Sequence, residues 1–158
     1  MTGRHALFLA FLWPTVTFLT GCSKPSTDDE MLQSATAHYR NDEFDDALND
    51  YQLLIKTYPK SDKVPEALLA MGVIYQNKKK EYRKAESLYT KLVMNFPDDP
   101  TAQSAAYERA RILIGNLHQP DSAKAAYEFF LQHYPDATSA PSARLELDSL
   151  NSNKPAAK

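Results

Sequence analysis

Residues 67–97 read ALLAMGVIYQNKKKEYRKAESLYTKLVMNFP, an apolar stretch, a basic turn and a second stretch that ends at a proline. Residues of the second stretch recur on both sides at a spacing of 38. The recurring sets are Ala47, Ala85 and Ala123; Tyr51, Tyr89 and Tyr127; Leu54, Leu92 and Phe130; Tyr58, Phe96 and Tyr134; and Pro59, Pro97 and Pro135. Apolar residues at i, i+4, i+7 and i+8 form one face of a helix, and proline ends it. The pattern predicts three copies of one amphipathic helix.

A second helix recurs at the same spacing. Ala67, Ala105 and Ala143 are again 38 residues apart, so the repeating unit is a helix pair. Small residues at Ala35, Gly72 and Ala110 are expected to let the two helices of a pair approach closely. After each proline, Asp, Ser and Thr side chains supply turns and N-caps for the next helix.

Composition agrees with a helical domain. Beyond residue 22 the chain has 18 alanines but only seven valines and isoleucines, which favours helix over strand. We therefore predict an all-α fold of three helix pairs within residues 31–150. The helix expected at 140–150 caps the last pair, and residues 151–158 are predicted to form a disordered tail.

The N-terminal segment is typical of a secretory signal. Arg4 and His5 precede an uncharged, mostly apolar run over residues 6–21, which contains Pro14 and is shorter than a membrane-spanning helix. The run ends in Leu19-Thr20-Gly21-Cys22, which resembles the lipobox of bacterial lipoproteins. That resemblance implies removal of residues 1–21, acylation of Cys22 with chains such as palmitate, and attachment to a membrane. Residues 22–30 are then a polar tether.

The repeats resemble a known family. The pattern Leu68-x2-Met71-Gly72-x2-Tyr75, followed by Ala85-x3-Tyr89 and Pro97, is similar to the tetratricopeptide motif W-x2-L-G-x2-Y…A-x3-F…P. The resemblance implies a right-handed superhelix. Together with the lipobox, the long period resembles that of the BamD/ComL outer-membrane assembly lipoproteins and the C-terminal domain of the YbgF/CpoB proteins. Ser23, in place of the Asp that retains many lipoproteins at the inner membrane, implies the periplasmic face of the outer membrane. The chain departs from BamD/ComL in having three repeats instead of about five, and from CpoB in lacking a coiled-coil N-terminus.

The tetratricopeptide resemblance also implies a binding surface. In such stacks the first helices line a groove that takes a protein or an extended peptide. The corresponding positions here are Leu32, Thr36, Tyr39, Arg40, Leu69, Val73, Gln76, Asn77, Tyr107, Arg111 and Ile114. Tyr and Arg side chains often dominate binding energy, so Tyr39, Arg40, Tyr107 and Arg111 are the expected anchors. The alternative is that each of them is solvated or packs on a neighbour. The paired Lys and Asn that some repeat proteins use to clamp a carboxylate are not evident.

Several classes of function find no support. A formal net charge of −2 does not favour nucleic acid as a partner, and one cysteine with four glycines gives neither a cysteine metal site nor a phosphate-binding loop. His5, His38, His118 and His133 lack the spacing of metal or catalytic sites, so we predict no cofactor, no metal and no enzyme activity. His38 takes the place of a packing aromatic. The acidic pairs at helix starts are explained by capping.

Two features leave alternatives open. The basic cluster of Lys78, Lys79, Lys80, Arg83 and Lys84 is either a solvated turn or a contact for lipid headgroups or an acidic partner. For the whole chain we favour an envelope scaffold that acts in outer-membrane protein assembly. An accessory of the Tol-Pal, division or cell-wall machinery is the alternative, and an envelope hydrolase is a remote one.

Overall fold

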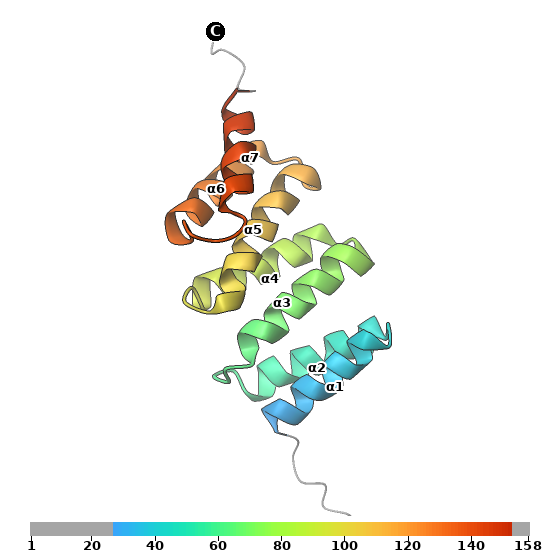
Figure 1. Ribbon diagram of the computed structural model, residues 1–158. Coiled ribbons are helices and arrows are strands. Elements are labelled where there is room, and N and C mark those ends of the chain that lie inside the picture. The colour runs from blue at the N-terminus through green and yellow to red at the C-terminus, as the bar shows by residue number, and fades with distance from the viewer. Residues whose placement is uncertain (1–26, 153–158) are drawn as a thin grey trace, which may run out of the picture.

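Seven α-helices form an elongated stack. The computed structural model describes residues 27–152, and within that range there is no β-strand. The helices are α1 (Asp28–Arg40), α2 (Phe44–Thr57), α3 (Val64–Ile74), α4 (Tyr82–Asn95), α5 (Pro100–Gly115), α6 (Pro120–His133) and α7 (Ala140–Ser152). A short π-helix, η1 (Tyr75–Lys79), continues α3. The helices follow one another along the stack from α1 to α7 (Figure 1). The all-α architecture of three helix pairs and a closing helix is confirmed.

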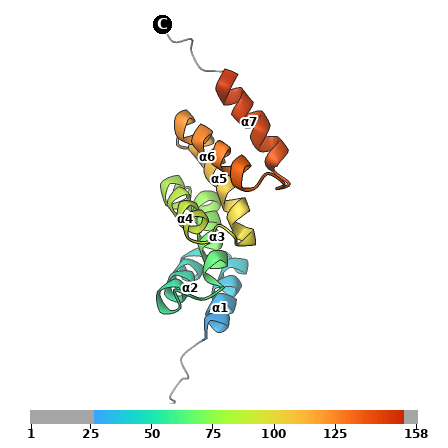
Figure 2. The same cartoon turned by 90° about the vertical axis from the view of Figure 1, so that its left-hand side faces the viewer.

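The pairs form two layers. Figure 2 shows α2, α4 and α6 along one side of the stack and α1, α3, α5 and α7 along the other. We call these sides the second-helix face and the first-helix face. The helices of the predicted repeat domain extend slightly past its expected limits, because α1 begins at Asp28 and α7 ends at Ser152.

The second helices repeat with high regularity. Each of α2, α4 and α6 has 14 residues, and each ends one residue before the aromatic that precedes the proline. The residues of the alanine and tyrosine sets and of the Leu54, Leu92 and Phe130 set are at most 3% exposed. Burying such a side chain contributes about 1.5–3 kcal/mol for the large ones, so the aromatic stripe belongs to the core.

At Gly72, the backbone of α3 lies very close to the Tyr89 ring of α4. A Cβ built on Gly72 would lie 2.8 Å from Cδ1 and 2.9 Å from Cζ of Tyr89, and nearer still to Cε1. Ala35 and Ala110, at the equivalent positions of the other pairs, are fully buried. The expectation that small residues allow tight pairing is therefore confirmed, and most strictly in the middle repeat.

A left-handed residue connects the two helices of every pair. Asp42, Lys80 and His118 have φ values of 60°, 57° and 53°, and they too are 38 residues apart. None is glycine, although this conformation costs an ordinary L-residue roughly 1 kcal/mol or more. The same backbone conformation therefore recurs at this position of each pair, although the residue type differs.

Caps differ among the first helices. Thr27 forms a capping box with Glu30 at α1, and the Asp99 carboxylate accepts from the Thr101 N–H at 2.8 Å at α5. At α3 the N-cap is Lys63, with no side-chain cap. The prediction of N-cap oxygens after each proline is thus correct at α5 and wrong at α3, where Ser61 instead accepts from the Lys63 N–H at 3.1 Å.

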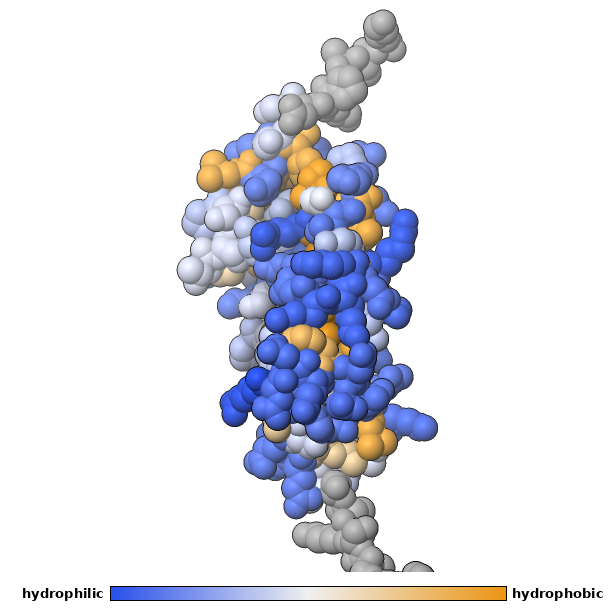
Figure 3. Space-filling model, turned by 90° about the vertical axis from the view of Figure 1, so that its right-hand side faces the viewer, coloured by the Kyte–Doolittle hydropathy of each residue, from blue (hydrophilic) through white to orange (hydrophobic). Residues whose placement is uncertain are grey.

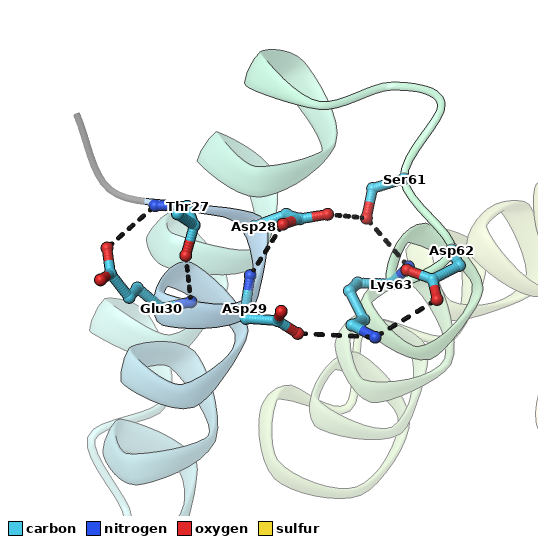
Figure 4. Close-up of polar contacts among 7 residues, drawn as sticks. All are labelled: Thr27, Asp28, Asp29, Glu30, Ser61, Asp62 and Lys63. Atoms are coloured by element: carbon cyan, nitrogen blue, oxygen red, sulfur yellow. Dashed lines mark hydrogen bonds and ion pairs between the residues drawn. The ribbon is translucent and has the colours of Figure 1, made fainter.

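The start of α1 is tied to the loop before α3. The Ser61 hydroxyl donates to the Asp28 carboxylate at 2.6 Å, and the Lys63 ammonium lies 3.5 Å from Asp29 (Figure 4). The hydrogen bond from Ser61 lowers the pKa of Asp28. These contacts connect the first repeat with the second at the end of the stack where α1 begins.

Candidate functional site

The first-helix face has two separate hollows, and each is lined by some of the predicted groove residues. At one end, a hollow of about 360 Å³ is lined by Leu32, Gln33, Thr36, Ala37 and Arg40 of α1. Leu32 and Thr36 are half-buried in it, and Arg40 is exposed. Tyr39 lies at the end of the same helix with its ring edge-on to Phe44, the centroids 5.9 Å apart. Tyr39 therefore packs on Phe44 and is also partly exposed to solvent.

The second hollow lies where η1, α5, α6 and α7 meet. Its volume is about 400 Å³, and its lining residues are Gln76, Arg111, Ile112, Ile114, Gly115, Asn116, Tyr127 and Glu146. The structure therefore brings together Gln76, Arg111 and Ile114, but not the predicted residues of α1. Leu69 and Val73 are half-buried on α3 and Asn77 is exposed on η1, and none of these three lines either of the two hollows described here.

Arg111 is held in place by its own helix. Its guanidinium donates to the Glu108 carboxylate at 2.9 Å and lies 5.9 Å from the centroid of the Tyr107 ring. Tyr107 packs in turn on Tyr127 and Phe130, with centroids 6.2 and 5.5 Å away. Tyr107 is thus half-buried, whereas Arg111 remains 54% exposed at the rim of the hollow.

Two carboxylates at this site were missed by the sequence analysis. Glu108 accepts from Gln76 at 2.8 Å as well as from Arg111, and so joins η1 to α5. Glu146 reaches the same hollow from α7. The helical register places Glu108 next to the predicted anchors, but Glu146 can be found only once the angle of the capping helix is known.

The hydroxyls of the repeated tyrosines point toward this face, and they end differently. Tyr51 Oη lies 3.5 Å from Thr36 Oγ1, and Tyr89 Oη donates to Gln76 Oε1 at 2.7 Å. The Tyr127 hydroxyl is buried and, within residues 27–152, has no hydrogen-bond partner. Burial raises the pKa of Tyr89 and of Tyr127, so both phenols stay protonated at neutral pH.

We expect the variants Tyr89→Phe and Tyr127→Phe to differ in their effect on the free energy of unfolding. Tyr89→Phe removes a donor from Gln76 and lowers the free energy of unfolding by about 1 kcal/mol. Tyr127→Phe removes a hydroxyl without a protein partner and leaves stability unchanged or raises it by up to about 1 kcal/mol. Urea unfolding followed by circular dichroism measures both. An equal loss in the two variants would mean that the Tyr127 hydroxyl is hydrogen-bonded in solution.

The histidines of residues 27–152 line neither of these two hollows. His38 Nδ1 lies 2.6 Å from Glu43 Oε2 and its Nε2 lies 3.7 Å from Asp50 Oδ2, so the expected packing aromatic is instead a half-buried ion-pair partner at the α1–α2 turn. The hydrogen bond with Glu43 raises the pKa of His38. His133 Nδ1 donates to the Phe129 carbonyl at 2.9 Å, as its place at the end of α6 predicts.

The described range contains neither a metal site nor a membrane-spanning helix. Residues 27–152 contain no group of three His, Cys, Asp or Glu side chains that could hold a metal ion. In the same range no helix has both the length and the apolar character needed to cross a bilayer. Cys22, and the signal and tether around it, lie outside the described residues apart from the last part of the tether.

Stacked helix pairs with an open first-helix face define the class of helical-repeat proteins. Within that class, residues 31–61 and 66–99 each match the family model described as tetratricopeptide repeat. The chain therefore has the tetratricopeptide-repeat fold, whose domains bind protein or peptide partners and are in general non-catalytic scaffolds.

Solved structures agree on the fold. A tetratricopeptide repeat protein from Parabacteroides merdae superposes with a TM-score of 0.66 at 20% identity, over 83% of this chain and 48% of that one. This chain thus spans about half the length of that protein. The tetratricopeptide domain of Arabidopsis OM64 gives a TM-score of 0.59 at 16% identity, over 80% of this chain and 96% of that domain. The C-terminal domain of a Plasmodium falciparum FK506-binding protein gives 0.52 at 18% identity, over 81% and 95%. A comparison with curated protein sequences gives no match.

Proposed function

We propose that this chain is a lipid-anchored scaffold of the bacterial envelope that binds a protein or extended peptide along its first-helix face. The observation that carries the binding role is the hollow between η1, α5, α6 and α7. It combines an exposed cation, Arg111, with an anion, Glu146, and with the apolar side chain of Ile114. Side chains of both charges and an apolar wall in one hollow suit a polypeptide, which offers carbonyls, amides and apolar side chains at short intervals.

The arrangement of Arg111 supports its role as an anchor. Stacking on Tyr107 and pairing with Glu108 restrict its guanidinium before a partner arrives, which reduces the entropy lost on binding. Four of its five N–H donors remain available for the partner, because the side chain makes one hydrogen bond within residues 27–152. Arg40 and Leu32 would extend the contact to the other end of the face.

Site-specific crosslinking tests the binding surface. A photoreactive amino acid in place of Arg111 or Arg40 is expected to trap a protein partner in cells. The same amino acid in place of Glu128, an exposed residue of α6, serves as the matched control and is expected to trap none. Equal trapping at Glu128, or none at any position of the first-helix face, would contradict the proposal.

The finer role that we propose is in outer-membrane protein assembly. Its support is the resemblance to BamD/ComL lipoproteins carried by the lipobox at Leu19-Thr20-Gly21-Cys22 and by the long repeat period. The alternative is an accessory of the Tol-Pal, division or cell-wall machinery. Mass spectrometry of the species trapped through Arg111 distinguishes the two, since the first role requires an assembly protein and the second a Tol-type or peptidoglycan-synthesis protein.

Lipid attachment has a separate test. Cys22→Ser is expected to abolish labelling by a radioactive fatty acid and to leave the signal uncleaved, because the thiol is the site of acylation. Ser23→Ala keeps the cysteine and serves as the control, with labelling and processing unchanged. Normal processing and membrane retention of the Cys22→Ser protein would overturn the lipid anchor without affecting the binding role.

A further inference from the structure

A second groove lies on the second-helix face, apart from both hollows described above. It has a volume of about 580 Å³ and lies among α2, α3 and α4. Its floor is apolar: Leu68 and Met71 are buried beneath it, and Ile55, Tyr75 and Leu88 are half-buried. A volume of this size is within the range of ordinary ligand sites.

Every charged side chain that lines this groove is a cation. They are Lys56 of α2 and Arg83, Lys84 and Lys91 of α4. The chain as a whole has a formal net charge of −2, so the basic rim is not a reflection of its composition. The groove concentrates positive charge above an apolar floor.

Most of these cations are not neutralised by the protein. Lys56, Arg83 and Lys91 form no ion pair with any other residue of the described range. Lys84 pairs with Glu81 at 2.6 Å and lies 5.0 Å from the centroid of the Tyr75 ring, which keeps its ammonium over the floor. The rim is therefore available to an anionic ligand.

The structure also divides the basic cluster seen in the sequence. Lys79 is 2.5 Å from Asp45 and Lys78 is 3.8 Å from Asp42, so these two lysines stabilise the turn between α1 and α2. Arg83 and Lys84 point into the groove instead. Ion pairs at the turn explain Lys78 and Lys79, whereas Arg83 and Lys84 belong to the rim of the groove.

The spacing of the cations indicates what they bind. Arg83 and Lys91 are eight residues apart on α4, which is about 12 Å along a helix. A single phosphate or carboxylate would pair with both only if the two long side chains bent toward one point, whereas a ligand with several separated negative charges matches their spacing directly. Its apolar groups must also reach Leu68 and Met71 between them.

We propose that this groove binds an acidic amphipathic helix of a partner protein. Carboxylates two turns apart would meet Arg83 and Lys91, and the leucine-like side chains between them would pack on the floor. Lys56 on the opposite wall would pair with a third carboxylate. Met71 adds a side chain that adapts readily to different apolar partners. The site is distinct from the first-helix face and does not depend on the function proposed for it.

Binding of a synthetic helix to the purified domain tests the proposal. The probe is a labelled peptide built from repeats of Glu-Ala-Leu-Leu-Glu-Ala-Leu, used at concentrations where it is monomeric and followed by fluorescence anisotropy. We expect the wild-type protein to bind it with an affinity that falls as salt is added. The double variant Arg83→Glu/Lys91→Glu is expected to bind about tenfold or more weakly, with an unchanged circular dichroism spectrum and melting temperature.

The controls keep the result specific. The double variant Lys60→Glu/Arg144→Glu makes the same change of charge at two exposed residues that line neither the groove nor the two hollows, and it is expected to bind the peptide like the wild type. A peptide with Lys in place of Glu is expected not to bind. Equal affinity of the groove variant and the wild type, or no binding by the wild type at about 100 µM peptide, would overturn the proposal.

A parallel experiment with lipid vesicles distinguishes an acidic helix from an anionic membrane surface as the ligand. Vesicles of phosphatidylglycerol and phosphatidylcholine are added to the same proteins and binding is followed by sedimentation. We expect no sedimentation of the soluble domain. Sedimentation of the wild type that is lost in the Arg83→Glu/Lys91→Glu variant would replace the acidic helix by an anionic membrane surface as the ligand.

Discussion

Replacing Phe130 by alanine is expected to lower the free energy of unfolding by about 3–5 kcal/mol, the usual cost of removing a buried phenylalanine ring. Phe130 is fully buried in α6, and its ring lies 5.5 Å from that of Tyr107 and 5.9 Å from that of Tyr134. The cavity would open between α5 and α6, beside the hollow that carries Arg111. The third repeat should therefore lose both packing energy and the support of its binding residues.

Chemical unfolding and hydrogen exchange measure the two parts of this prediction. The first gives the loss of stability, and the second should show faster exchange in α5, α6 and α7 than in α1 and α2, since neighbouring repeats support one another locally. Leu145→Ala is the matched control, because that side chain is 72% exposed and its removal should cost less than about 0.5 kcal/mol. Similar losses in the two variants would refute the packing described for α6.

Gly72→Ala is expected to destabilise the domain by about 1–3 kcal/mol, although alanine is the better helix former by about 1 kcal/mol. The new methyl group would overlap the ring of Tyr89, which is fully buried and has its hydroxyl bonded to Gln76. The ring cannot move aside without breaking that bond or disturbing the core. Steric overlap should therefore exceed the gain in helix propensity.

Gly115 provides the opposite case within the same chain. It is the last residue of α5, and a Cβ there would have no heavy atom within 4 Å. Gly115→Ala is expected to raise the free energy of unfolding by about 0.4–1 kcal/mol through the unfolded state. Thermal and urea unfolding of both variants give the comparison. A neutral or stabilising Gly72→Ala change would contradict the close approach of α3 to α4.

Much of the fold could be predicted from the sequence because its apolar residues repeat. The alanine, tyrosine and proline sets specify α2, α4 and α6 closely, since each is amphipathic and ends at a proline. The left-handed turns could not be found in this way: Asp42, Lys80 and His118 share a backbone conformation but no side-chain chemistry. The polar contacts before α1 and α3 likewise depend on Thr27, which caps α1, and on Ser61, which accepts from the Lys63 N–H, and these two residues occupy unequal positions in their repeats.

The site was less accessible to sequence reasoning because it depends on how helices from different repeats meet. The resemblance to tetratricopeptide repeats identified Gln76 and Arg111, which the structure brings to one hollow, but it also grouped them with Leu32 and Arg40, which lie in another. Tyr127 reaches the hollow from α6 and Glu146 reaches it from α7. Neither helix is the first helix of a pair, so the sequence of one repeat does not indicate that these residues line the hollow.

The contacts of Asp28 and Asp29 with the loop before α3 have a mechanical consequence. If the chain is held to a membrane through its N-terminus, any load from a moving partner enters the domain at Thr27. Ser61 and Lys63 pass part of that load directly to the second repeat, so that α1 and the start of α3 bear it together. Peeling of the first helix under tension would then require the rupture of bonds in two repeats at once.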